Sequence, residues 1–163
     1  MPSKLQIVPT RPVPAVAEAA LDQSKLLGLV GYNLRRAYLI AVTPAFKKRM
    51  AKYQLRPVEY TILVLLKSNP NINQKRLAQA ISVSPPNMAT LLDRLENRNL
   101  LQRQRNPLDK RAQTLLLTSE GLALCTRAEK TIAELDRDAT SILSDAERDE
   151  LLRLLQKLFL AQG

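Results

Sequence analysis

Basic side chains gather around one turn of the sequence, RQRNPLDKR (residues 103–111). They are Arg103, Arg105, Lys110 and Arg111, and Asp109 lies among them. Guanidinium and ammonium groups donate charge-assisted hydrogen bonds to phosphate oxygens, and a carboxylate two residues before Arg111 can orient that guanidinium. The segment therefore predicts contact with a nucleic-acid backbone, with an arginine placed in the minor groove. The alternative is a surface hairpin whose charges keep an edge strand from aggregating.

A second group of polar residues precedes this turn, in SPPNMATLLDRLEN (residues 84–97). At about 100° per residue, one side of a helix here carries Pro86, Asn87, Thr90, Asp93, Arg94 and Asn97. In a major groove Asn can pair with adenine, the Thr methyl can touch thymine, and Arg can reach guanine or phosphate. We therefore expect DNA contacts here and at the start of the preceding helix, from Gln74, Lys75, Ser84, Pro85, Pro86, Asn87, Thr90 and Arg94. The alternative is an ordinary solvated face.

Two short helices and a hairpin must hold these side chains in place. Asn73 can cap the first helix, whose buried stripe is Leu77, Ala78 and Ile81. Ser84 can cap the second helix and Pro85 suits its first position, while its buried side is Met88, Leu91, Leu92 and Leu95. Residues 100–103 and 112–117 favour two strands, and residues 106–109 supply the turn between them.

The upstream segments favour further helices. Apolar residues recur every three or four positions from about Leu21 to Tyr53, which predicts one helix with a kink at Pro44. Another helix is predicted from Pro57 to the break at Ser68-Asn69-Pro70. Several prolines near the N-terminus predict an extended arm over residues 1–20.

Aromatic residues cluster in these upstream helices, with two arginines among them. An apolar cleft that contains an arginine fork is typical of a site for a small carboxylate or phosphate. We expect such a site at Tyr32, Arg35, Arg36, Tyr38, Phe46 and Tyr60. The alternative is that the rings fill the core and the arginines are solvated.

Composition limits the classes of function. Lys and Arg number 25 against 15 Asp and Glu, and this net charge of +10 favours an anionic partner. The sequence contains no histidine and one cysteine, Cys125, so we expect no Ser-His-Asp or Cys-His catalysis, no metal site and no cofactor. We expect Cys125 to be a small buried hydrophobe. The apolar runs are too short to span a bilayer, so we expect a cytoplasmic protein without a membrane partner.

The C-terminal segment predicts a helix that is more apolar than one surface helix needs. Ser144 and Glu147 match the S-x-x-E capping box at its start. The helix then carries Leu151, Leu152, Leu154, Leu155, Leu158 and Phe159. This wide stripe favours a subunit interface over packing within one chain.

The turn and the helix before it resemble those of a known family. Asp109-Lys110-Arg111, five intervening residues and Leu117-Thr118 resemble the wing signature of the MarR family of winged helix-turn-helix transcriptional regulators. TLLDRLENRNLLQR (90–103) is similar to its recognition helix and following strand, and LRPVEYTILVLL (55–66) to the entry into its second helix. Asn99 stands where the family usually has glycine, and Arg56 where a capping Thr or Ser is common. Asn tolerates the left-handed conformation, so we expect the turn to be kept.

The resemblance implies a mainly α fold with a small β-hairpin, in which a winged helix-turn-helix domain joins a helical dimerisation region. After the proline-rich arm (1–20), the implied parts are an N-terminal dimerisation helix (21–55), the DNA-binding region (56–118) and C-terminal dimerisation helices (119–163). It implies a homodimer on a pseudo-palindromic double-stranded operator, and a repressor released by a small anionic aromatic acid or its CoA thioester. The alternative function is a basic helical protein that binds nucleic acid non-specifically, without a ligand.

Overall fold

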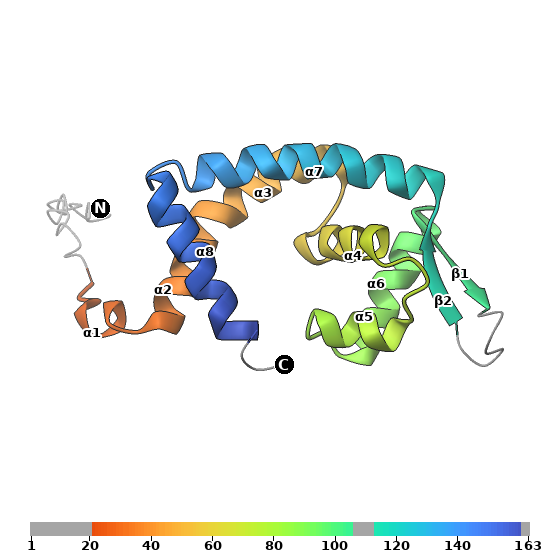
Figure 1. The fold of residues 1–163 in the computed structure, drawn as a ribbon, viewed down its shortest axis with the longest axis horizontal. Coiled ribbons are helices and arrows are strands. Elements are labelled where there is room, and N and C mark those ends of the chain that lie inside the picture. Colours follow the sequence, from red (N-terminus) through yellow and green to blue (C-terminus); the bar gives the residue numbers. More distant parts are fainter. Residues whose placement is uncertain (1–20, 106–112, 161–163) are drawn as a thin grey trace, which may run out of the picture.

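The computed structural model describes residues 21–105 and 113–160 of the chain. The elements in chain order are α1 (Ser24–Leu27), α2 (Val30–Ala37), η1 (Tyr38–Val42), α3 (Thr43–Met50), η2 (Ala51–Tyr53), α4 (Pro57–Ser68), α5 (Gln74–Ala80), α6 (Pro85–Asn97), β1 (Leu101–Arg105), β2 (Gln113–Leu117), α7 (Ser119–Ala139) and α8 (Asp145–Leu160). Figure 1 shows an arch: α7 spans the top with α3 beside it, α2 and α8 descend at one end, and α4, α5, α6 and the hairpin form the other. The predicted mainly helical fold with one hairpin is confirmed. The expected arm at residues 1–20 lies outside the described residues.

The helices α4, α5 and α6 follow the sequence prediction closely because their start signals are local. Glu59 accepts a hydrogen bond from the backbone N–H of Arg56 at 2.8 Å, which stabilises the start of α4. Asn73 Oδ1 accepts from the N–H of Arg76 at 2.9 Å, so the predicted cap of α5 is confirmed. Ser84 stands at the cap position of α6, but its side chain makes no capping hydrogen bond. That part of the prediction is wrong: Pro86, the second residue of the helix, has no N–H to donate, and the N–H of Asn87 at the third position makes no bond to the Ser84 hydroxyl either.

The N-terminal segment is not the single helix that the apolar spacing predicts. The chain breaks after α1, where Leu29 is extended (φ −100°, ψ 120°). The kink expected at Pro44 is a π-helical turn, η1, immediately upstream. Pro44 cannot donate to the carbonyl four residues earlier and its ring crowds that carbonyl, so the backbone widens. The hydroxyl of Thr43 donates to the carbonyl of Tyr38 at 3.1 Å, as does its backbone N–H.

The two strands pair as an antiparallel hairpin, in a register that sets Leu101 opposite Leu117. The backbone N–H of Leu115 donates to the carbonyl of Ile72 at 3.0 Å, which fixes the hairpin beside the start of α5. The strands begin one residue later than predicted, an ordinary difference at element ends. Asn99, just before the hairpin, has φ 55°, so the expected left-handed turn is confirmed.

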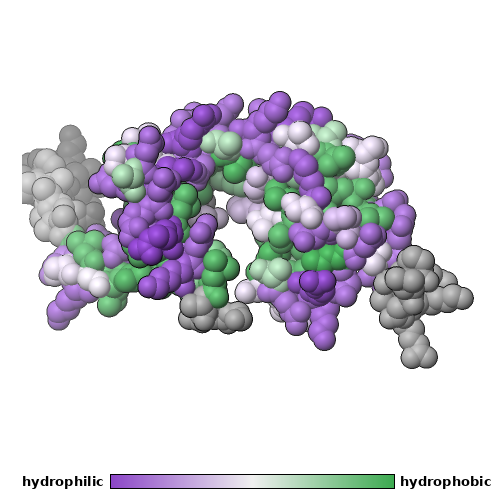
Figure 2. Space-filling model, viewed as in Figure 1, coloured by the Kyte–Doolittle hydropathy of each residue, from purple (hydrophilic) through white to green (hydrophobic). Residues whose placement is uncertain are grey.

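The core lies between α3, α4, α5, α6, the hairpin and α7. Its fully covered side chains include Met50, Ile62, Leu77, Leu92 and Leu115. In contrast, α1, α2 and α8 bury no residue, and Figure 2 shows apolar side chains at the surface of this end of the arch. The predicted capping box of α8 is confirmed by the hydrogen bonds between Ser144 and Glu147. Among the described residues, no helix has both the length and the apolar character needed to cross a membrane.

Candidate nucleic-acid interface and ligand cavities

The polar face of α6 points away from the core. Met88, Leu92 and Leu95 are buried on one side of the helix, and packing of this stripe turns the opposite side outward. Pro86, Asn87 and Thr90 are exposed there, as the spacing predicts. The hydroxyl of Thr90 donates to the carbonyl of Pro86 at 3.2 Å, which leaves its methyl group and lone pairs for other contacts.

The start of α6 offers hydrogen-bond donors from Asn87 and Ser84 only, because its first two residues are prolines. Pro85 and Pro86 lack an N–H, so the first amide donor of the helix belongs to Asn87. The Ser84 hydroxyl makes no bond to the helix and can donate to an outside acceptor. Donors at this end, where the helix dipole is positive, suit phosphate oxygens.

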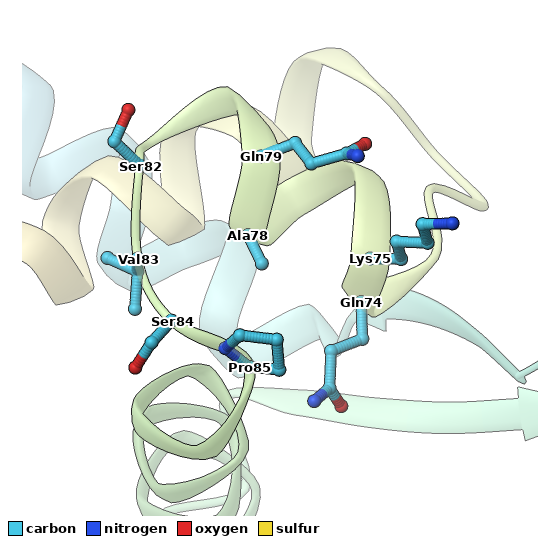
Figure 3. A pocket seen from close by; sticks show the side chains of 8 residues that line it. All are labelled: Gln74, Lys75, Ala78, Gln79, Ser82, Val83, Ser84 and Pro85. Atoms are coloured by element: carbon cyan, nitrogen blue, oxygen red, sulfur yellow. The ribbon is translucent and has the colours of Figure 1, made fainter.

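A cavity of about 730 Å³ opens where α5 meets the start of α6, and Figure 3 shows its lining. The lining combines residues predicted to touch DNA with others outside that prediction: Gln74, Lys75, Ala78, Gln79, Ser82, Val83, Ser84 and Pro85. Gln79 and Ser82 line the cavity although they follow no stripe or cap pattern in the sequence. Ser82 has a positive φ (53°) in the turn between α5 and α6. Serine does not mark such a turn strongly in a sequence, so this turn could not be predicted from the residue type.

Arg94 turns toward the body of the protein instead of extending freely from α6. Its Nε lies 3.1 Å from Oε1 of Glu59, an ion pair that lacks hydrogen-bond alignment. Glu59 is fully buried, and its other oxygen accepts from the N–H of Arg56. A buried carboxylate without a cation is costly, so this pair ties α6 to α4.

Arg103 is also paired within the protein. Its Nη2 lies 2.6 Å from Oδ1 of Asp93, and its Nη1 contacts the carboxylate of Glu96. Both carboxylates belong to α6, so the guanidinium joins β1 to that helix. Asp93 therefore has a partner within the protein, and it remains exposed on the polar side of α6 where its spacing predicts it.

The tip of the hairpin carries the remaining predicted contacts. Asp109, Lys110 and Arg111 lie outside the described residues, as does the predicted turn at 106–109. Arg105 ends β1, opposite Gln113 in the register. Arg105 and Gln113 are thus the last described pair of the hairpin, whose two strands Figure 1 shows at the end of the arch that also holds α5 and α6.

The aromatic residues predicted to form one ligand site lie in different surroundings. Phe46 is a core residue, 8% exposed, whereas Tyr38 is 47% exposed. The hydroxyl of Tyr32 contacts the side-chain oxygen of Gln23, and Arg35 and Arg36 are exposed on α2. Only Tyr60, among these predicted residues, lines one of the two cavities described next. Its half-buried position raises the pKa of its hydroxyl, first through burial and then through the negative charge of Glu129.

Two adjoining cavities share Asp136 and Arg148. One, of about 600 Å³, lies between α4, α7 and the start of α8, and Tyr60 and Glu129 also line it. The other, of about 440 Å³, is lined mostly by apolar residues of α2, α7 and α8. Arg148 Nη2 lies 2.7 Å from Asp136 Oδ2, while its buried Nε has no hydrogen-bond partner within the described residues. A guanidinium with a spare buried donor between a polar and an apolar space can bind an amphipathic anion.

Comparison with known proteins adds three similarities and one family match. The sequence model of the MarR family matches residues 55–112. A protein of Thauera aromatica, described as a proposed transcriptional regulator of the hcr operon, is 30% identical over 141 residues, covering 86% of this chain and 85% of that protein. The transcriptional repressor CouR bound to a 23-mer DNA duplex is 36% identical, with a TM-score of 0.80 over 86% of this chain and 99% of that one. CouR bound to p-coumaroyl-CoA is 35% identical, with a TM-score of 0.77 over 85% and 97% of the two chains.

Proposed function

Because the chain belongs to the MarR family of transcriptional regulators, we propose that it is a repressor that binds a pseudo-palindromic operator as a homodimer and leaves it when a small anionic aromatic ligand binds. The ligand is a free aromatic acid or its CoA thioester. The proposal includes no catalytic step. A regulator of transcription works where the chromosome lies, so the proposal places the protein in the cytoplasm.

The single observation that carries the DNA-binding part is the exposed polar start of α6. Asn87 and Thr90 face outward from a helix whose other side is held in the core. This arrangement suits insertion in a major groove, and the net charge of +10 adds attraction to phosphates. The repressor CouR, bound to a DNA duplex in its structure, matches this chain over nearly its whole length.

The exposed apolar surface of the helical end supports the homodimer. Leu154, Leu158 and Phe159 of α8 are 45%, 53% and 63% exposed, although they are large and apolar. Leu27 and Val30, around the start of α2, are 60% and 65% exposed. Apolar surface of this extent is typical of an interface with another chain. A second copy that covers it would bring two recognition helices onto one duplex.

The ligand proposal rests on the two cavities that meet at Arg148. An aromatic ring fits the apolar cavity beside α2, and a carboxylate or a thioester oxygen can accept the spare donor of Arg148. The polar cavity beside Tyr60 leaves room for a longer head. Arg35 and Arg36, exposed on α2, would bind the phosphates of a CoA moiety. CouR bound to p-coumaroyl-CoA is a relative with a ligand of this chemistry.

Selection of duplexes from a random pool tests the DNA-binding part of the proposal. The expected product is a two-fold symmetric sequence, with half-sites about one helical turn apart. Footprinting upstream of the protein's own gene should protect a site with the same symmetry. A pool that gains no consensus would favour the alternative, a basic protein that binds nucleic acid through charge alone.

Calorimetry with matched free acids and CoA thioesters tests the ligand part. Arg148→Ala should weaken binding of both compounds by roughly tenfold or more, because each loses a charge-assisted contact. The double variant Arg35→Ala, Arg36→Ala should weaken only the thioester. Arg153→Ala, which removes an exposed arginine of the same helix, is the control and should change neither. Ligand affinities that are unchanged in the Arg148→Ala and Arg35→Ala, Arg36→Ala variants would refute this site.

A further inference from the structure

The chain crosses between the layer of α3 and α7 and the winged region at two places. One crossing, residues 51–56, consists of η2 and the linker from α3 to α4, and the other is Thr118, between β2 and α7. Figure 1 shows both crossings descending from the upper layer of α3 and α7 to the end that holds α6. The short turn after α6, residues 98–100, contacts both of them.

Arg98 makes the contact with the first crossing. Its Nη1 donates to the carbonyl of Gln54 at 2.8 Å, and its Nη2 donates to the carbonyl of Tyr53 at 2.9 Å. Carbonyls at the end of a helical segment lack helical partners, and Gln54 turns away in the left-handed conformation (φ 51°). The planar guanidinium fork spans the two acceptors at once, which a lysine ammonium does not do in the same geometry.

Tyr53 extends this contact to α7. Its hydroxyl lies 3.0 Å from Oγ1 of Thr131 and 3.2 Å from the carbonyl of Arg127. Thr131 is buried at 8% exposure, so the contact fixes the Tyr53 hydroxyl to a core residue of α7. Hydrogen bonds therefore run from the end of α6 through Arg98 and Tyr53 to the long helix.

The second crossing is fixed by backbone contacts. Thr118 Oγ1 donates to the carbonyl of Asn99 at 2.6 Å, and the N–H of Thr118 donates to the carbonyl of Leu100 at 3.2 Å. Gly121 packs so closely on that carbonyl that an added Cβ would lie 1.8 Å from it. Close backbone packing therefore fixes the turn on this side, whereas on the other side the turn is joined to the first crossing by the side chain of Arg98.

We propose that Arg98 is a positioning residue, which holds the recognition helix α6 at one angle to α7 and thereby sets the spacing between the two half-sites that a dimer reads. This inference rests on the proposed function, because it needs a dimer on a symmetric operator. Without Arg98, each α6 still presents Asn87 and Thr90, but the two helices no longer keep one fixed separation.

The test measures binding to a series of duplexes that carry the selected half-sites with the central spacer lengthened or shortened by one or two base pairs. The parent protein should prefer one spacing by about tenfold or more. Arg98→Ala should bind the best duplex more weakly and lose most of this preference. Arg98→Lys, which keeps the charge, should also fail to restore it. Tyr53→Phe keeps both carbonyls but loses the bond to Thr131, and should flatten the profile in part.

Two controls separate positioning from stability and charge. Lys130→Ala removes one exposed positive charge from α7 and should leave the spacing profile unchanged. Thermal melting of every variant reports its stability, and a destabilised but correctly positioned protein would lose affinity equally for all spacings. A parent with a sharp profile and an Arg98→Ala variant with the same profile would overturn the role of Arg98 alone. A parent that binds all spacings alike would overturn the proposed function as well.

Discussion

Arg94 and Arg103 each face a carboxylate of this chain, although their type and position predict contacts with DNA. Arg103 joins β1 to Asp93 and Glu96 of α6, and Arg94 lies against the buried Glu59. An arginine in such a pair holds the elements of the DNA-binding surface together, and the carboxylate neutralises much of its positive charge. We therefore expect sequence discrimination to depend more on Asn87 and Thr90 than on either arginine.

The roles of the recognition helix and the hairpin tip can be separated by single substitutions. Asn87→Ala or Thr90→Ala should relax the preference at particular base pairs, by about 1 to 3 kcal/mol each, because each side chain reaches base edges. Arg111→Ala should weaken binding to all duplexes with only a modest loss of discrimination. Competition binding against single-base operator variants measures both effects. An Arg111→Ala protein that binds its operator as tightly as the parent would disprove the role given to the hairpin.

The thiol of Cys125 should be unreactive near neutral pH. The side chain is fully buried, and burial, followed by the charge of Glu129, raises the pKa of its thiol to about 11. The thiolate is the reactive form, so little of it exists near pH 7, and reactivity should rise only as the pH approaches that value. Native protein should resist iodoacetamide at pH 7, and Cys125→Ser should bind DNA like the parent with or without peroxide. Peroxide-induced release that disappears in Cys125→Ser would contradict this view.

At the scale of elements, the sequence predicts α4, α5 and α6 well, because their signals are local. Pro57 and Asn73 fix helix starts within a few residues, and the apolar stripes fix which faces are buried. The N-terminal segment was predicted less well. Its apolar spacing continues through the break at Leu29, and the widening at η1 depends on how the backbone adapts to Pro44.

The candidate sites also differ in how far the sequence predicts them. The face of α6 follows from helical spacing alone, so its exposed residues could be predicted. Arg98 could not, because its acceptors are backbone carbonyls far away in sequence and no residue type marks them. The cavities at Arg148 are assembled from α2, α7 and α8, so only the folded chain brings their lining together.

Gly121 tests the packing of α7 against the turn after α6. Gly121→Ala should lower the free energy of unfolding by about 1 to 3 kcal/mol, because the new methyl group would overlap the carbonyl of Leu100. Gly28→Ala is the matched control: apart from its chain neighbours, no atom of residues 21–105 or 113–160 lies within 4 Å of its added Cβ, and its effect should stay within about 0.5 kcal/mol. Denaturant unfolding of both variants measures the difference. Equal stability would show that α7 does not approach the turn this closely.

At the scale of the whole molecule, the two ends of the arch differ in character. The end with α4, α5 and α6 has a closed core and presents polar side chains, whereas the end with α2 and α8 leaves large apolar side chains at its surface. The first end suits DNA and the second suits another copy of the chain. A single protomer therefore presents only half of the surface that a symmetric operator requires.

Charge placed on α8 should separate the protomers. Leu158→Glu puts a carboxylate at a position that is apolar and 53% exposed, and it should shift the protein from dimer to monomer because burying that charge is costly. Sedimentation velocity measures the change, and specific DNA binding should fall with it. Gln156→Glu adds the same charge at an exposed polar position of the helix and should leave the dimer intact. A Leu158→Glu protein that stays dimeric would place the interface elsewhere.

The central claim is that two copies of this chain read one symmetric duplex by sequence. Its most direct test is a titration, at one moderate salt concentration, of the selected operator, the same operator with one half-site scrambled, and a random duplex. The account predicts two chains per operator, an affinity at least about a thousandfold above that for random DNA, and a large loss when one half-site is scrambled. Affinity for all three should fall steeply as salt rises, because Lys and Arg side chains displace counterions from phosphates. Equal affinity for all three duplexes would contradict the account.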